Sequence, residues 1–236
     1  MDNIIVFGSN GYIGSRFIQQ TQSSKIIGID ISHNSLNECS CNVKTFNFDI
    51  SEVSNYKILT NYLDEENIMI DKVLFSHGSN NFANFFTSEI NEFENSIRIN
   101  LIGVYIALKI LYPYLKDNSS ILVIASQNGV VGHEDRIDYG TAKAGLIHLV
   151  KNLTLDFAKY SDKDIKINAL SPGYILNDSN KEFFKTYKGK KLISKNPYGK
   201  IVSIDEVIYS INFLLSEASH SIRGQNIIID YGYTIQ

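Results

Sequence analysis

The sequence has few cysteines, no excess of basic residues and no long apolar run, and each absence excludes a class of protein. Its 236 residues include only two cysteines, Cys39 and Cys41. Two cysteines cannot form a disulfide framework, and a single Cys-x-Cys spacing lacks the second half of a zinc site. We therefore expect reduced, incidental thiols and no bound metal.

The charge and hydropathy patterns exclude further classes. The 22 basic residues against 25 acidic ones give a net charge of −3, whereas a nucleic-acid or anionic-membrane partner usually requires a basic excess. No stretch reaches the ~18 uninterrupted apolar residues of a membrane helix, and the first residues lack the basic segment of a signal peptide. With 44% hydrophobic residues, the chain can bury a sizeable core. We expect a soluble, cytoplasmic protein with neither nucleic acid nor a membrane as partner.

Short apolar runs rich in β-branched residues recur along the chain, each bounded by Gly, Asn, Asp or Ser. Continuous hydrophobicity of this kind is typical of parallel strands that are buried on both faces. Strands are predicted over residues 4–7, 26–29, 43–48, 73–75, 121–124, 165–170 and 227–229.

Apolar residues at helical spacing fill several of the intervals between these strands, predicting helices over residues 12–21, 89–116, 139–160 and 204–216. The alternation predicts an α/β fold with a doubly wound parallel sheet, the Rossmann fold, in three α/β/α layers. No linker, repeat or low-complexity block divides the chain, so residues 1–236 are predicted to form one domain. The polar, Lys-rich stretch 177–200 is predicted to be a lid over the substrate rather than a plain surface insertion.

A glycine turn follows the first predicted strand directly and leads into a predicted helix. Glycine lets the backbone approach a pyrophosphate closely, and the free N–H groups of the helix N-terminus bind the anion. The position of the turn at the first strand–helix junction favours a dinucleotide site. Its residues are Gly8, Ser9, Asn10, Gly11, Tyr12, Ile13 and Gly14.

Asp30 ends the second predicted strand, about 20 positions beyond the glycines. A carboxylate at this place binds the adenosine ribose hydroxyls and repels a 2′-phosphate. Asp30, followed by Ile31, therefore predicts NAD in preference to NADP. The alternative is a loop acid or helix cap with no ligand.

Tyr139 and Lys143 are four residues apart at the start of a predicted helix, so both side chains can face one cleft. A phenol with its ordinary pKa near 10 exchanges protons poorly at neutral pH. A neighbouring ammonium lowers the pKa of the phenol and makes it usable as an acid or base. Ser126, which follows the predicted strand 121–124, could hydrogen-bond a substrate oxygen in the same cleft.

Together these motifs resemble those of the short-chain dehydrogenase/reductase family, in its shorter single-domain branch, over nearly the whole chain. Further positions match the family's cofactor contacts. They are Asp49 and Ile50 for the adenine, Ser76, His77 and Gly78 for the strand end that reads Asn-Asn-Ala-Gly in the family, and Pro172, Gly173 and Ile175 for the turn beneath the nicotinamide.

The resemblance also implies a role for each catalytic residue. Tyr139 exchanges the proton with the substrate oxygen, and Ser126 holds that oxygen. Lys143 binds the nicotinamide ribose and lowers the pKa of Tyr139. Asn100 matches the helix asparagine that supports a proton-relay water.

Three positions depart from the family's pattern. Tyr12 stands where the middle glycine is usual, Phe7 replaces a Thr, and Asn177 takes the place of the Thr that meets the cofactor carboxamide. The glycine spacing is typical of a longer, sugar-nucleotide-modifying branch. The length of the chain leaves no room for the second domain of that branch.

The resemblance implies hydride transfer between a nicotinamide cofactor and a carbonyl or secondary alcohol, in a homodimer or homotetramer. A keto-sugar, a polyol and a 3-oxoacyl compound are all compatible substrates. The alternatives are a catalytically silent dinucleotide-binding regulatory protein and a sugar-nucleotide epimerase or dehydratase. Besides the lid, the predicted substrate contacts are Ser126, Gln127, Asn128, His133 and Tyr174.

Overall fold

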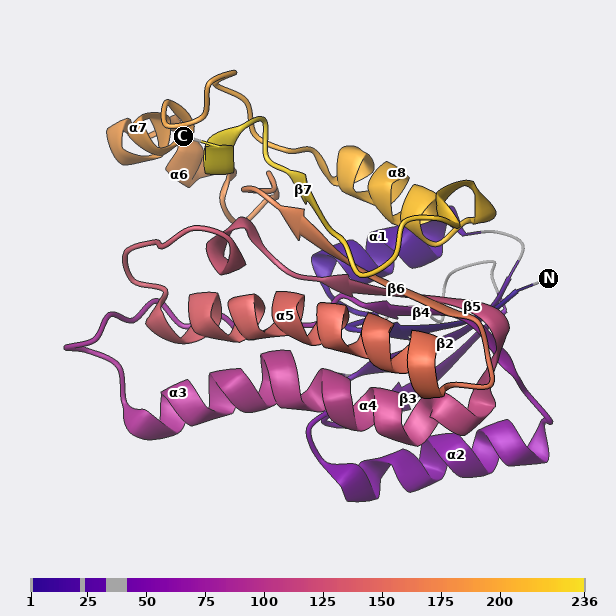
Figure 1. Cartoon of the computed structure of the whole chain (residues 1–236). Helices are drawn as coiled ribbons and strands as arrows, with labels where there is room; N and C mark the ends of the chain where they lie inside the picture. The colour runs from indigo at the N-terminus through magenta and orange to yellow at the C-terminus, as the bar shows by residue number, and fades with distance from the viewer. Residues whose placement is uncertain (1, 22–23, 33–41, 236) are drawn as a thin grey trace.

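A computed structural model describes residues 2–21, 24–32 and 42–235. The prediction for Cys39 and Cys41 therefore lies outside the described residues. Within this part of the chain, seven parallel strands form one sheet in the order β3-β2-β1-β4-β5-β6-β7 (Figure 1). The strands are β1 Asn3–Phe7, β2 Lys25–Asp30, β3 Val43–Asn47, β4 Ile70–Phe75, β5 Leu115–Ile124, β6 Ile165–Pro172 and β7 Asn226–Ile229.

The central strands are hydrophobic on both faces because helices cover both faces of the sheet. In β1 the four residues after Asn3 are buried, and every residue of β6 is buried. The strand order reverses between β1 and β4, which are direct neighbours. In an open α/β sheet, ligands bind at such a reversal, beyond the carboxyl ends of the strands.

The helices form two layers, one on each face of the sheet (Figure 1). One core contains buried residues of α1 and α8, and the other contains buried residues of α2, α4 and α5. These layers confirm the predicted three-layer α/β/α Rossmann fold. The helices of the two layers are α1 Tyr12–Gln20, α2 Tyr56–Glu65, α4 Gly103–Leu111, α5 Ile137–Tyr160 and α8 Ile204–Leu214.

The helix predicted over 89–116 is not one regular helix. Helix α3 (Ile90–Ile97) continues into a π-helical turn, Arg98–Ile102, before α4 begins, and a 3₁₀ turn follows α4. Pro113 lies in that 3₁₀ turn, where its missing N–H and its ring prevent the helix from continuing. The last two residues predicted as helical are instead the first two of β5, because Leu115 pairs with Ile70 of β4.

By length and composition alone, the run Ile90–Tyr114 could cross a membrane. In the structure its apolar residues Val104, Leu108 and Leu111 lie in the core with residues of the sheet. The core helix of a soluble protein passes the same test of length and composition, so this one run is weak evidence for a membrane span.

Two parts of the chain differ from the prediction in helix content. Helix α2 was not predicted, although its buried residues Tyr56, Leu59 and Leu63 follow a helical spacing. The predicted lid, residues 177–200, in which no helix was predicted, contains two short helices, α6 (Lys181–Lys185) and α7 (Tyr187–Ile193). Both helices lie beyond the carboxyl end of β6, near the C-terminus of the chain (Figure 1).

Candidate functional site

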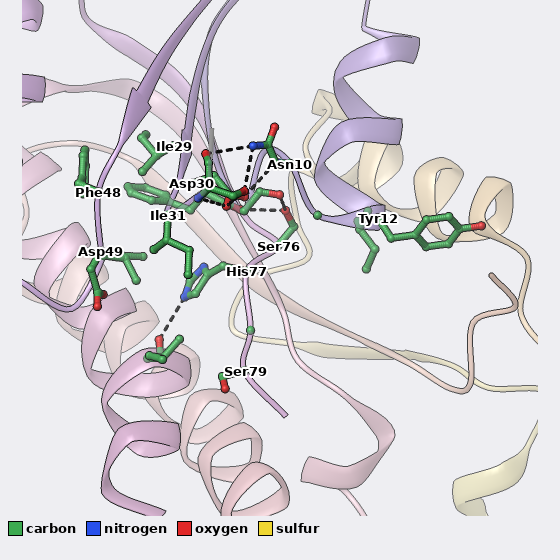
Figure 2. Close-up of a pocket in the computed structure, with 18 of the residues that line it drawn as sticks. Asn10, Tyr12, Ile29, Asp30, Ile31, Phe48, Asp49, Ser76, His77 and Ser79 are labelled. Carbon is green, nitrogen blue, oxygen red and sulfur yellow. Dashed lines mark hydrogen bonds between the residues drawn. The ribbon is translucent and has the colours of Figure 1, made fainter. Parts of the chain in front are cut away.

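A cleft of about 770 Å³ lies beyond the carboxyl ends of β1, β2, β3 and β4 (Figure 2). It opens where the strand order reverses, as the fold requires. Most of the predicted cofactor residues line it. They are Gly8, Asn10, Gly11, Tyr12, Ile13, Asp30, Ile31, Asp49, Ile50, Ser76, His77, Gly78, Tyr139, Ile175 and Asn177.

The glycine turn brings the start of α1 to this cleft. Gly8 has φ +79°, and a Cβ on it would lie 2.5 Å from the backbone nitrogen of His77, so only glycine fits between β1 and β4. Helix α1 has Gly11 at its N-cap, no capping side chain and no acid in its first turn. Its first N–H groups are thus open to an anion, and this donor set fits the pyrophosphate of a dinucleotide.

Two residues of the turn support its shape from behind. A Cβ on Gly14 would lie 2.2 Å from the carbonyl oxygen of Gly8. Ser9 is fully buried, with its side chain against Gly28 of β2. Neither residue lines the cleft, so their contribution is the close packing of the turn.

Asp30 lies at the rim of the cleft and stabilises the loops around it. Its carboxylate accepts hydrogen bonds from the backbone N–H of Asn10 (2.9 Å) and from the backbone N–H and hydroxyl of Ser32 (3.0 and 2.8 Å). Figure 2 shows Asp30 and Asn10 together at this end of the cleft. A carboxylate keeps further acceptor capacity beyond these bonds, so Asp30 can also accept from a ligand hydroxyl.

Tyr12, which stands in place of a glycine, joins α1 to the segment that precedes residues 177–200. Its hydroxyl donates to the carbonyl of Leu176 at 3.0 Å, and Figure 2 shows the ring pointing away from Asp30. Asn177 follows directly and lines the cleft. Its side-chain oxygen accepts from the backbone N–H groups of Ser179 and Asn180 and so starts the turn into α6.

His77 replaces the family's asparagine and is neutral at physiological pH. Its Nε2 is 3.2 Å from the carbonyl oxygen of Ile99, which can only accept, so the proton is on Nε2. Burial lowers the pKa of His77 to about 4. Its ring lies edge-on to Phe7 and Phe75, the stacked pair at the ends of β1 and β4.

Tyr139 and Lys143 both lie at the start of α5, as predicted. The Lys143 amino group is buried, donates to the carbonyl of Ile124 at 2.8 Å and lies 5.6 Å from the centre of the Tyr139 ring. Burial lowers the pKa of Lys143 to about 8. A lysine with this pKa carries only part of its charge slightly above neutral pH.

The pKa of Tyr139 is raised, not lowered as predicted. Burial of the phenol raises it, and this exceeds the opposing effects of the Ser126 hydroxyl and of the Arg136 charge. The reason is the low polarity around the phenol, which disfavours the phenolate. The phenol of Tyr139 is therefore protonated at neutral pH, the form that donates a proton.

The turn that follows β5 packs on helix α5, and this packing brings Ser126 close to Tyr139. Ser126 caps the 3₁₀ turn Gln127–Gly129, its oxygen accepting from the N–H of Asn128 at 3.1 Å. The turn packs directly on α5, and a Cβ on Gly129 would lie 2.7 Å from the backbone carbon of Lys143. Only the absence of a side chain at Gly129 allows this approach.

Asn100 lies in the π-helical turn and holds the loop after β4. Its amide nitrogen donates to the carbonyls of Ser79 (2.8 Å) and Ser96 (2.9 Å), and its oxygen accepts from the N–H of Ser79 (3.3 Å). Its side chain is thus used in fixing the loop beside Gly78. The predicted water relay at Asn100 stays a prediction.

The predicted substrate residues Gln127, His133 and Tyr174 gather beside this centre, with Asn128 in the turn after Ser126. The Tyr174 hydroxyl is 2.6 Å from Nε2 of His133, and Nδ1 of His133 is 2.7 Å from the carbonyl oxygen of Glu134. The carbonyl can only accept, so Nδ1 of a neutral His133 carries the proton and Tyr174 donates to Nε2. Burial raises the pKa of Tyr174 to about 12.

Pro172 ends β6 next to these residues and Gly173 follows it, but neither residue lines the cleft. The N–H of Gly173 donates to the carbonyl of Ile229 at 2.9 Å, which holds the turn against β7. Several residues that line the cleft were not predicted, although most of them flank predicted positions at strand ends. They are Phe7, Ile29, Ser32, Phe48, Ser79 and Ile99.

Comparison with known proteins finds that the chain is similar to dehydrogenases and reductases. A family model described as enoyl-(acyl carrier protein) reductase matches residues 25–234. The 7alpha-hydroxysteroid dehydrogenase of Bacteroides fragilis is 27% identical over 251 residues, which cover 98% of this chain and 94% of that protein. The 3-oxoacyl-(acyl-carrier-protein) reductase of Buchnera aphidicola is 34% identical over 143 residues, covering 60% of this chain and 57% of that one.

The fold also matches solved structures along its whole length. A 4-hydroxyisoleucine dehydrogenase in complex with NADH superimposes with a TM-score of 0.88 at 24% identity and covers 100% of both chains. At this identity the likeness concerns the fold alone.

Proposed function

The chain belongs to the short-chain dehydrogenase/reductase family, and from this premise we propose that it transfers a hydride between NAD and the carbonyl or secondary-alcohol carbon of a small molecule. Relatives that act on hydroxysteroids, arabinitol and 3-oxoacyl compounds support oxidoreduction at such a carbon. One observation carries the proposal. Ser126, Tyr139 and Lys143 come together beside a cleft whose other end is a glycine turn.

The described residues fit a nicotinamide dinucleotide. The N–H groups at the start of α1 would bind its pyrophosphate, Asp30 would accept from the adenosine ribose, and Lys143 would donate to the nicotinamide ribose. When bound, the nicotinamide ring accepts or supplies the hydride.

The residues of the chain would handle the proton and the substrate oxygen. Ser126 and Tyr139 would both hydrogen-bond the oxygen of the reacting carbon. The raised pKa of Tyr139 keeps its phenol protonated, so the free site is prepared to donate a proton during reduction. In the oxidation of an alcohol the phenol must first lose that proton, which requires a higher pH.

We propose that NAD is the preferred cofactor, because Asp30 adds a negative charge where NADP carries its 2′-phosphate. We also propose a cytoplasmic location, where a soluble enzyme has access to NAD; cell fractionation tests this. Neither proposal depends on which alcohol or ketone is the substrate.

A homodimer or homotetramer is proposed from the outer face of α4 and α5. Tyr105 on α4 and Leu155 and Tyr160 on α5 have exposed fractions of 47%, 69% and 72%. A groove of about 420 Å³ that includes Tyr105 and Tyr160 lies between these helices. A second copy could cover this apolar surface.

The Tyr139→Phe variant tests the catalytic proposal. We expect turnover to fall by about 10²–10⁴-fold because the variant lacks the positioned acid, while NADH binding changes little. The assay follows NADH consumption with a panel of ketones and NADH binding by fluorescence. Tyr209→Phe, which changes an exposed tyrosine of α8, is the control and should keep full turnover.

The pH dependence of alcohol oxidation tests whether the phenol of Tyr139 takes part in the reaction. Alcohol oxidation by the wild type should increase with pH, because the raised pKa leaves little phenolate near neutrality. Turnover by the Phe variant at wild-type rates would refute the role of Tyr139. NADH binding without turnover of any ketone or alcohol would favour the silent regulatory alternative.

The Gly129→Ala variant tests the contact that places Ser126. The added Cβ would push the turn away from the backbone of Lys143, so we expect kcat to fall by about 10-fold or more, as misplaced catalytic groups do. Gly132→Ala is the matched control, since a Cβ at Gly132 has no neighbour within 4 Å. Equal activity of the two variants would show that this contact does not position the site.

The Asp30→Asn variant tests the cofactor preference. It keeps one side-chain oxygen to accept from Asn10 or Ser32 but removes the charge. We expect kcat/KM for NAD to exceed that for NADP in the wild type, and the ratio to fall by about 10-fold in the variant, which corresponds to about 1.4 kcal/mol. A wild type that prefers NADP would contradict the role given to Asp30.

The native mass tests the assembly. A dimer or tetramer should elute at two or four times the 26.6 kDa of the chain. Leu155→Glu should shift the protein toward the monomer, because a buried, unpaired charge is costly. Ile58→Glu, on the exposed face of α2, is the control. A monomeric wild type would refute the assembly.

A further inference from the structure

Charge is unevenly distributed along this chain. The lid, residues 177–200, contains seven lysines against two acids, whereas the remaining residues contain fifteen basic residues against twenty-three acidic ones. A net negative protein therefore has a lid with a net charge of +5.

Ion pairs neutralise only a small part of the positive charge of the lid. Its two acids, Asp178 and Glu182, pair with Lys181 at 2.9 Å and with Lys185 at 2.7 Å. The other lysines are exposed, and none forms an ion pair with an acidic residue of the described parts of the chain. They are Lys188, Lys190, Lys191, Lys195 and Lys200.

The lid is attached to the substrate side of the site. Phe184 of α6 packs edge-on against Tyr174 at 5.9 Å between ring centres. Leu192 and Ile193, at the end of α7 and beside Lys190 and Lys191, line a small cavity together with Gln127 and Tyr174. The end of the lysine-rich helix thus shares a cavity with two of the predicted substrate residues.

Five positive charges without an ion pair in one short segment repel one another, although Lys200 also lies over the ring of Tyr231 at 5.5 Å. An anion bound among them relieves this repulsion. The Debye length at physiological salt is about 8 Å, so these charges act on ligand groups that come within about that distance of α7. We infer that the substrate has a phosphate or carboxylate group in addition to its reacting carbonyl or alcohol, and that the lid lysines attract and hold this group. The inference rests on the proposed function and narrows its substrate class to anions.

The cofactor is an anion too, so it is the competing explanation for the lid charge. The start of α1 already supplies N–H donors for a pyrophosphate. If the lid served the cofactor instead, loss of the lysines would raise the KM for NADH. The experiment therefore measures KM for NADH alongside that for the substrate.

The test uses matched pairs of an anion and its uncharged analogue, acetoacetate with ethyl acetoacetate and dihydroxyacetone phosphate with dihydroxyacetone. The lid variant is K188Q/K190Q/K191Q. The control K57E/N61D removes the same three units of charge from exposed positions of α2, a helix of a different layer. Each protein is assayed by NADH consumption across a range of salt concentrations.

We expect the wild type to prefer the anionic member of each pair that it reduces. The lid variant should lose about 10-fold in kcat/KM for that member at low salt, through KM, and the loss should largely disappear near about 0.5 M salt. The control variant and the uncharged substrates should change by less than about 2-fold.

Three outcomes would overturn the inference. They are a preference for the uncharged members, an equal loss in the lid and α2 variants, and a change confined to the KM for NADH. If NADH binds but no pair is reduced, and the wider ketone panel is not reduced either, the proposed function itself fails and the inference fails with it. If NADH reduces ketones in a reaction that depends on Tyr139, but the lid variant keeps the wild-type kcat/KM for the anionic members, the proposed function stands and only the inference is lost.

Discussion

The buried amino group of Lys143 is the constraint on which the rest of the site depends. It donates to the carbonyl of Ile124 at the end of β5, and a Cβ at Gly78, after β4, would lie 3.6 Å from it. The buried amino group thus ties α5 to the end of β5 and lies close to the backbone that follows β4. Its cost in solvation is visible in its pKa of about 8, and such a cost is typical of functional sites.

Charge is unevenly distributed around the site. Asp30 and Asp49 line the cleft, whereas residues 177–200, which we propose as a lid, have a net positive charge. Tyr12 links the glycine turn to this segment, because its hydroxyl donates to the carbonyl of Leu176. A glycine at this position would lack that hydrogen bond, so the departure from the family's glycine pattern has a structural consequence.

Much of the fold and many site residues were predictable because strand burial and glycine spacing are local signals. Most of the predicted cofactor residues line one cleft. The predictions that were wrong concern places where a local pattern competes with a contact or an environment that only the folded chain provides. The segment 89–116 has a helical pattern, but Pro113 ends the helix and β4 pairs with its last residues. The pKa of Tyr139 was predicted from a neighbouring charge, whereas burial decides its direction.

The sequence by itself determined the alternation of strands and helices, the phosphate-binding turn, and the family to which Ser126, Tyr139 and Lys143 point. These follow from hydrophobic spacing and from backbone requirements of glycine, which need no knowledge of distant neighbours. The tertiary structure decided what depends on contacts between distant segments. Burial sets the direction in which the pKa of Tyr139 shifts, and the approach of Gly129 to α5 positions Ser126. The packing of Phe184 on Tyr174 places α6 beside the predicted substrate residues.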